Sequence, residues 1–316
     1  MLEFPDYRSH PAYRFRHSVF SSTAETMKFL PALLRSAVLH LKGSPFRPDY
    51  RRGVRNSEAA SGFYRNGCLT FGLSEDAAND LYARVRGILE PWRDEHRAIP
   101  AACRTMWNAL RNIDEAEHKQ VYDSVCEHLP TPVSELLRAA LGNARPSQIQ
   151  LSNFFADDEP LFKLGANTLT KYAPWHVDPV INTLKIITYL TPVGEAQGPF
   201  HYLRGSHRFN DSVLDRIVIH AHRFTGSGRP GWTWFNDEEG RRRFAALPAF
   251  LQKKNTLGAD FIDGWELLDS RHDNIEVLTG PPGTAALFDP LGIHCGGKLL
   301  EGERVALISI FTPGKH

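Results

Sequence analysis

The residue pattern of this chain changes near its midpoint, and this change limits the folds that it can adopt. Before residue 142, apolar residues recur at helical spacing, as in 74–89, 115–129 and 131–142. From residue 148 onward, short runs rich in β-branched and aromatic residues take over, as in 148–151 and 183–190. Helices followed by a group of strands favour an α+β fold, in which the helices brace one sheet and the second half forms a two-sheet jelly roll.

Local signals indicate where the helices begin and end. Ser74 suits the N-cap of one helix, and Thr131 with Pro132 starts another, which stops at Gly142. Residues 27–42 form a further amphipathic pattern. This helix could pack on the outside of the core or against a second subunit, which would make a homodimer through the N-terminal segment. Contact with a membrane surface is the weaker alternative.

Residues that can bind a metal recur at informative positions. His176 and Asp178 are two positions apart, so an extended strand would project both to one face and Val177 to the other. Such a pair is most often a surface hydrogen-bonded pair. However, His294 follows a predicted buried strand at 283–288 and could supply a third ligand. Two imidazoles and one carboxylate form the facial triad that holds non-haem Fe(II).

Arg304 follows His294 by ten positions and opens a further predicted strand at 304–311. The glycine-rich connection 296–303 suits a hairpin, which would bring Arg304 back near His294. A guanidinium offers paired donors in a fixed geometry to a carboxylate. The alternative is a solvated charge at the start of a strand.

Over residues 60–314 the chain resembles the phytanoyl-CoA dioxygenase family of Fe(II)- and 2-oxoglutarate-dependent oxygenases. Four landmarks carry the resemblance in the family's order: the His-x-Asp at 176–178, a Gly-Pro stretch ending in Gly-Ser-His at 198–207, then His294 and Arg304. The resemblance implies a cupin-like, double-stranded β-helix core braced by the N-terminal helices. It also implies that residues 63–70, which are similar to the family's opening strand, lie in a strand before the helix at residue 74.

The resemblance also implies roles for individual residues. His176, Asp178 and His294 would bind Fe(II), and Arg304 would hold the distal carboxylate of the cosubstrate 2-oxoglutarate, with O2 as the oxidant. Lys171 could face the cosubstrate, although a solvated lysine at a strand end is an equally good interpretation.

The implied activity is oxidation, most simply hydroxylation, of a C–H bond in a small organic molecule, with succinate and CO2 as coproducts. Related halogenases replace the metal-binding carboxylate with a small residue, so Asp178 disfavours halogenation. The alternative is a non-oxidative, metal-binding cupin-like protein, either an isomerase or a binding protein. Such a protein has no use for Arg304. A structural or interaction protein with incidental His and Asp residues is a third interpretation.

Length and pattern favour one oxygenase domain, 56–316, after an N-terminal extension, 1–55. Residues 209–275 interrupt the strands as a long insertion, which we expect to act as a lid or to recognise substrate. An external helical decoration is nearly as good an interpretation. Within it, His220 and His222 form a His-x-His that could imitate a metal site on a strand, but no third ligand has a suitable spacing. His207 is expected to fix a turn by hydrogen bonding.

Composition excludes some classes of protein. The chain has 37 Lys and Arg against 36 Asp and Glu, a balance that argues against a nucleic-acid binder. Its four cysteines form no Cys-x-x-Cys pattern, which favours free thiols in a reducing compartment. No run of apolar residues is long enough to span a bilayer, and the N-terminus lacks the layout of a signal peptide, so we expect a cytoplasmic protein without stable membrane insertion.

Overall fold

The computed structural model describes residues 23–42, 58–100, 110–156, 178, 183–210, 213–222, 248, 251, 274–297 and 299–313. The described strands form two antiparallel sheets. The six-stranded sheet has the order β1 (Cys68–Gly72), β7 (Thr284–Phe288), β4 (Leu184–Tyr189), β9 (Glu303–Phe311), β3 (Gln148–Phe155) and β2 (Leu110–Ile113). The three-stranded sheet has the order β6 (Ile275–Leu278), β5 (Phe200–Leu203) and β8 (His294–Gly296).

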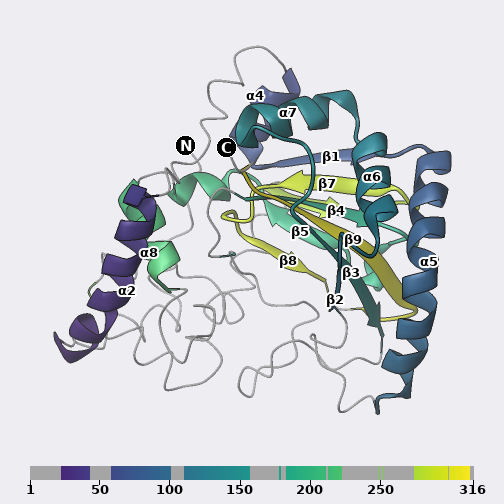
Figure 1. Cartoon of the computed structure of the whole chain (residues 1–316), viewed down its shortest axis with the longest axis horizontal. Helices are drawn as coiled ribbons and strands as arrows, with labels where there is room; N and C mark the ends of the chain where they lie inside the picture. The colour runs from purple at the N-terminus through teal and green to yellow at the C-terminus, as the bar shows by residue number, and fades with distance from the viewer. Residues whose placement is uncertain are drawn as a thin grey trace.

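The α-helices in the described residues are α2 (Thr23–Lys42), α4 (Glu58–Asn66), α5 (Glu75–Ala98), α6 (Lys119–His128), α7 (Thr131–Leu141) and α8 (Val213–His222). Two short 3-10 helices, η5 (Glu195–Gln197) and η6 (Ser206–Asn210), flank β5. Figure 1 shows α5 and α6 beside the larger sheet, α4 and α7 at one end of it, and α2 with α8 on the opposite side of the molecule. No helix among the described residues is long and apolar enough to cross a membrane.

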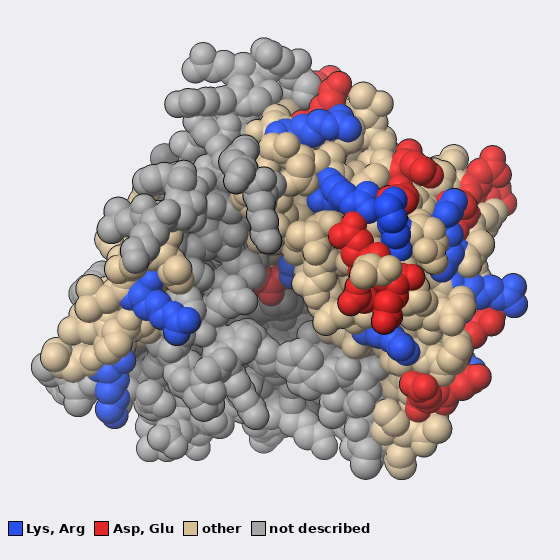
Figure 2. Space-filling view, in the orientation of Figure 1, with Lys and Arg blue, Asp and Glu red and all other residues tan. Residues whose placement is uncertain are grey.

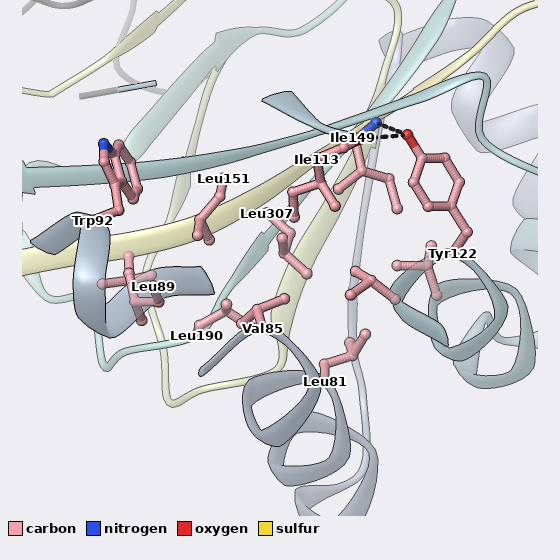
Figure 3. Close-up of a cluster of buried hydrophobic side chains, with 13 residues drawn as sticks. Leu81, Val85, Leu89, Trp92, Ile113, Tyr122, Ile149, Leu151, Leu190 and Leu307 are labelled. Carbon is pink, nitrogen blue, oxygen red and sulfur yellow. Dashed lines mark hydrogen bonds between the residues drawn. The ribbon is translucent and has the colours of Figure 1, made fainter. Parts of the chain in front are cut away.

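The outer face of the larger sheet is buried against the helices. Leu81, Val85 and Leu89 line one side of α5 and pack with Leu151 and Leu307 of the sheet, as Figure 3 shows. Each fully buried side chain of this kind contributes about 1.5–3 kcal/mol relative to exposure. A second cluster joins α4 and α7 to β1, β4, β7 and β9. The helices therefore brace one sheet, as the sequence predicted.

Polar contacts fix two of these helices. The Ser74 hydroxyl accepts a hydrogen bond from the backbone N–H of Ala77, which confirms the predicted N-cap of α5. The Tyr122 hydroxyl of α6 donates to the Ile113 carbonyl at 2.9 Å and accepts from the Ile149 N–H at 3.0 Å. Figure 3 includes these bonds, which hold α6 across β2 and β3.

The two sheets face each other across a buried aromatic layer. Phe200 and Tyr202 of the smaller sheet pack with Tyr189, Phe288 and Ala306 of the larger one. The Tyr189 hydroxyl donates to the Leu278 carbonyl at 3.0 Å and accepts from the Phe200 N–H at 2.8 Å, so a polar pair also links the sheets. Two facing antiparallel sheets with this filling are the arrangement expected of a jelly roll.

The structure confirms the strands predicted at 148–151, 183–190, 283–288 and 304–311. Their observed bounds differ from the predicted ones by at most four residues. The strand predicted at 63–70 is wrong in its first part. Residues up to Asn66 belong to α4, and the strand starts at Cys68. Phe63 is fully buried in the cluster between α4 and α7, and this packing favours the helix.

The hairpin predicted at 296–303 is also wrong. His294 and Gly296 of β8 pair with Tyr202 and Phe200 of β5, whereas β9 pairs with β3 and β4. The connection therefore passes from the smaller sheet to the larger one. The physical reason is that β9 lies in the middle of the large sheet, where both of its edges already have partners.

The helix predicted at 27–42 is confirmed as α2, and it packs on α8. The Ser36 hydroxyl donates to the Ile217 carbonyl at 2.8 Å. Because α8 is a helix, the His-x-His at positions 220 and 222 does not lie on a strand. Most of the insertion 209–275 lies outside the described residues, and the proposed homodimer remains a prediction.

Candidate metal centre

Asp178 and His294, two of the three predicted metal ligands, lie together. The Nε2 atom of His294 is 3.6 Å from Oδ2 of Asp178, a separation at which one ion about 2.1 Å from each atom can contact both. The Asp178 N–H donates to the Pro290 carbonyl at 2.8 Å, which places its backbone against the loop that precedes β8. His176 and Lys171 lie outside the described residues. Within the described part of the chain, no group of three or more metal-binding side chains occurs.

The ring of His294 has a defined tautomer. Its Nδ1 lies 2.9 Å from the Gly292 carbonyl oxygen, and because a carbonyl only accepts, Nδ1 carries the proton. The lone pair is then on Nε2, the atom that faces Asp178. Metal-binding histidines usually donate their other N–H in this way. Aromatic rings of Phe200, Tyr202 and Phe288 surround the imidazole at centroid distances of 5.9, 6.5 and 5.1 Å.

The loop before His294 is tied to the Gly-Ser-His stretch. The Ser206 hydroxyl donates to the Leu203 carbonyl at 2.6 Å and accepts from the Ile293 N–H at 2.7 Å. The sequence predicted that His207 acts by hydrogen bonding, and its Nε2 bonds with the Tyr64 carbonyl of α4, at 3.0 Å. This motif therefore holds the candidate site against the rest of the fold.

Arg304 is buried, with 7% of its surface exposed. Its Nη1 donates to the Gly297 carbonyl at 3.3 Å, and its guanidinium lies 5.2 Å from the ring centroid of Phe154. It reaches β8 at Gly296, where an added Cβ atom would lie 3.4 Å from Nη2. Arg304 thus returns close to the strand of His294, as predicted, although by a crossing between sheets.

No described carboxylate neutralises this guanidinium. The ionisable groups nearest to it electrostatically are Tyr189 and Cys295, and burial raises the pKa of both, so they stay uncharged at neutral pH. Burial lowers the pKa of His201, and the charge of Arg304 lowers it further, so this imidazole is neutral too. Burial also lowers the pKa of Arg304, yet an arginine remains protonated in proteins. A buried guanidinium without a carboxylate partner among the described residues suits the binding of an anion, because a buried charge is costly unless it is paired.

Sequence reasoning missed Lys185. Its ammonium donates to Asp178 Oδ2 at 2.5 Å, the same oxygen that faces His294. The available signal was its position in β4, where it alternates with Leu184 and Ile186 in a strand that is otherwise mostly apolar. Figure 2 shows a recess near the middle of this face of the molecule, with acidic and basic atoms side by side inside it.

The donor set fits a divalent metal. An imidazole with a free Nε2 lone pair and a carboxylate oxygen are ligands that Fe(II) and similar ions accept. The Gly292 carbonyl that orients His294 is a further feature of such sites.

No family model matches the chain, and no curated protein matches it, so the resemblance to the phytanoyl-CoA dioxygenase family rests on the residues quoted above. Similar solved structures include EctD from S. alaskensis with 2-oxoglutarate and 5-hydroxyectoine, at 18% identity, covering 82% of this chain and 77% of that one, with a TM-score of 0.46. HygX from Streptomyces hygroscopicus, with nickel and 2-oxoglutarate bound, is 13% identical to this chain. The match covers 82% of this chain and 87% of HygX, with a TM-score of 0.44. SnoK, a non-heme alpha ketoglutarate dependent carbocyclase from nogalamycin biosynthesis, is 16% identical to this chain. The match covers 83% of this chain and 89% of SnoK, with a TM-score of 0.46.

Proposed function

We propose that this chain is an Fe(II)- and 2-oxoglutarate-dependent oxygenase that acts on a small organic molecule, most simply by hydroxylating a C–H bond. The observation that carries the proposal is the combination of the Asp178–His294 pair with the buried Arg304, which has no carboxylate partner among the described residues and lies close to the same short strand. We further propose that the facing sheets are the double-stranded β-helix implied by the family resemblance, within one domain at 56–316.

Each residue has a defined task in this proposal. His176, Asp178 and His294 hold the iron, with His176 assigned from sequence alone. Bound iron, O2 and 2-oxoglutarate supply the oxidising chemistry, with succinate and CO2 as coproducts. The Gly292 carbonyl keeps the proton of His294 on Nδ1, so that Nε2 remains free to bind. Arg304 binds the distal carboxylate of the cosubstrate.

Several surrounding features support these tasks. The aromatic rings around His294 exclude water from that side of the site. Phe154 lies against the guanidinium and helps to fix its direction. Lys171 is proposed to face the cosubstrate. The free thiols of Cys68, Cys126 and Cys295 favour a reducing compartment such as the cytoplasm.

The non-oxidative alternative, an isomerase or a binding protein that keeps only the metal, leaves Arg304 without a task. A guanidinium buried without a carboxylate is costly unless an anion joins it. We therefore favour the oxygenase.

The test is an anaerobic titration of the metal-free protein with Fe(II) and then 2-oxoglutarate, followed by visible spectroscopy. We expect the weak charge-transfer band of the iron–2-oxoglutarate chelate in the wild type. Asp178→Ala should abolish the band, whereas Asp114→Ala, at an exposed carboxylate, should not. Arg304→Gln should raise the 2-oxoglutarate concentration needed for half saturation by about 10- to 100-fold. Arg111→Gln, at an exposed arginine, is its control.

A protein that binds Fe(II) but gives no band at saturating 2-oxoglutarate would be a non-oxidative metal protein. Unchanged 2-oxoglutarate affinity in Arg304→Gln would remove the cosubstrate role from that residue.

A further inference from the structure

Lys185 places a positive charge on the inner face of the larger sheet. Leu184 and Ile186 pack against the helices on the outer face, so the alternation of the strand directs Lys185 inward, together with Ile187 and Tyr189. Its side chain is 18% exposed. A charged residue in this position needs a binding partner, and its described partner is Asp178.

Asp178 cannot neutralise both Lys185 and a metal. In the proposed function, Asp178 binds iron, and the ammonium then lies beside a doubly charged ion. The charges of Fe(II), a dianionic 2-oxoglutarate and the described side chains of Asp178, Arg304 and Lys185 leave one positive charge over. An uncompensated charge in a site of low dielectric is costly, so the loaded site favours one further anion.

Arg304 and Lys185 serve different anions. Lys185 pairs in register with Ile310 of β9, whereas Arg304 lies six residues away on the same face of that strand. Six strand residues span roughly 20 Å. The two cations therefore approach the metal centre from opposite ends of the inner face. With Arg304 assigned to the cosubstrate, Lys185 remains for the substrate.

The inner face beside Lys185 is less covered than the rest. Tyr189 and Ala306 are fully buried beneath the smaller sheet, but Ile308 and Ile310, next to Lys185, are only partly buried. In β3, the next strand across the sheet, Gln148 pairs with Ile310 and so continues the row of Lys185 and Ile310.

Lys185, Ile308 and Ile310 form a partly buried strip on the inner face. This strip ends in a group of amides. The Asn112 Oδ1 atom accepts hydrogen bonds from the Nε2 atoms of Gln148 and Gln150, at 2.7 and 2.9 Å. The floor thus runs from a cation, across two isoleucines, to hydrogen-bonding amides.

We propose that Lys185 binds a carboxylate of the substrate once the metal occupies Asp178, and that the remainder of the substrate lies over Ile308 and Ile310 toward the amides. The substrate is then a small monocarboxylic acid. A single negative charge balances these described groups, whereas a phosphate ester carries up to two at neutral pH. This inference rests on the proposed function and assigns a substrate class to it.

The test uses fluorine probes and a paramagnetic metal, so that no turnover is needed. Protein loaded with Mn(II) and 2-oxoglutarate is mixed with trifluoroacetate, and the fluorine relaxation rate is compared with that of neutral trifluoroacetamide. A Zn(II)-loaded sample gives the diamagnetic baseline. We expect trifluoroacetate to relax at least fivefold faster than the amide in the wild type. Lys185→Met should abolish the difference, and Lys185→Arg should retain most of it.

Two further arms make the assignment specific. Lys119→Met, at an exposed lysine of α6, should leave the relaxation unchanged. Difluoromethylphosphonate replaces trifluoroacetate in the second arm, and a stronger effect from this probe would overturn the carboxylate assignment. Circular dichroism of each variant checks the fold.

Separate binding measurements distinguish this inference from the proposed function. If the wild type fails to bind Mn(II) and 2-oxoglutarate, the proposed function fails. If both bind, but trifluoroacetate relaxes equally in wild type and Lys185→Met, the substrate inference alone is wrong. A tenfold loss of 2-oxoglutarate affinity in Lys185→Met would make Lys185 a ligand of the cosubstrate, and would overturn the inference as well.

Discussion

His294 depends on a glycine two positions before it. The Gly292 carbonyl accepts the Nδ1 hydrogen bond, and the residue lies directly against Tyr202. A Cβ atom at Gly292 would overlap the phenol of Tyr202, whose Cε2 atom would lie 2.9 Å away. The Tyr202 hydroxyl in turn donates to the Asp289 carbonyl, so neither group can move without disturbing the loop.

Gly292→Ala should therefore shift the loop and misdirect Nε2. We expect a loss of about 1–3 kcal/mol in the free energy of unfolding, and weaker Co(II) binding by about tenfold or more. Denaturant unfolding and calorimetric Co(II) titration measure the two effects. Gly72→Ala is the matched control, because a Cβ atom there would meet nothing within 4 Å. Equal Co(II) affinity in both variants would contradict the role of Gly292.

At this scale the sequence predicted the groups that carry chemistry better than the groups that support them. The proximity of Asp178 and His294 follows from motif order, because both residue types are strongly selected by metal chemistry. Lys185 could not be found in the same way, since a lysine in a strand usually points to solvent. Its inward direction is fixed by the packing of Leu184 and Ile186, which only the tertiary structure reveals.

At the scale of elements, one hydroxyl connects η6, the end of β5 and the loop before β8. Ser206 is 1% exposed and bonds with both Leu203 and Ile293. Ser206→Ala would leave the Ile293 N–H buried without that acceptor, which costs about 1–3 kcal/mol. We expect this loss in denaturant unfolding, together with weaker Co(II) binding. Ser147→Ala, which removes an exposed hydroxyl, should change stability by less than about 0.5 kcal/mol. Similar losses in both variants would show that the bridge is unimportant.

Helices α5 and α6 are joined by a carboxylate whose stability contribution depends on pH. Hydrogen bonds from Arg84, Ser124 and His128 hold the pKa of Asp80 well below its usual range. Folding thus favours the ionised form, so the stabilisation is present above the unfolded pKa of about 4 and is lost as the pH falls below it. The difference in Tm between wild type and Asp80→Asn should narrow from pH 5 to pH 3. Thermal scans that show a constant difference would contradict this, and Asp94→Asn, on the same helix, is the control.

For the whole molecule, local pattern predicted the strands but not all of their partners. Alternation and β-branched residues identify β4, β7 and β9, because a strand with a buried face carries apolar residues in a recognisable pattern along the sequence. The hairpin assigned to 296–303 failed because a glycine-rich connection is equally compatible with a crossing between sheets. The partners of a strand in a sheet are determined by contacts between residues distant in sequence, such as the pairing of Arg304 with Phe154. The four-residue strand β2 was missed for the same reason, since its ladder with β3 is its main contact.

The metal-free fold and the loaded fold should differ in stability rather than in architecture. Lys185 pairs with Asp178, so a side chain of the protein itself can neutralise this carboxylate. A ligand that binds only the folded state adds about 2.7 kcal/mol at one hundred times its Kd. Co(II) should therefore raise Tm by roughly 5 °C or more, and 2-oxoglutarate should raise it again.

In Arg304→Gln the first rise should persist and the second should nearly vanish, because only the cosubstrate uses the guanidinium. Equal second rises in wild type and Arg304→Gln would separate Arg304 from the cosubstrate. Loss of the first rise in Arg304→Gln would show instead that the arginine maintains the metal centre.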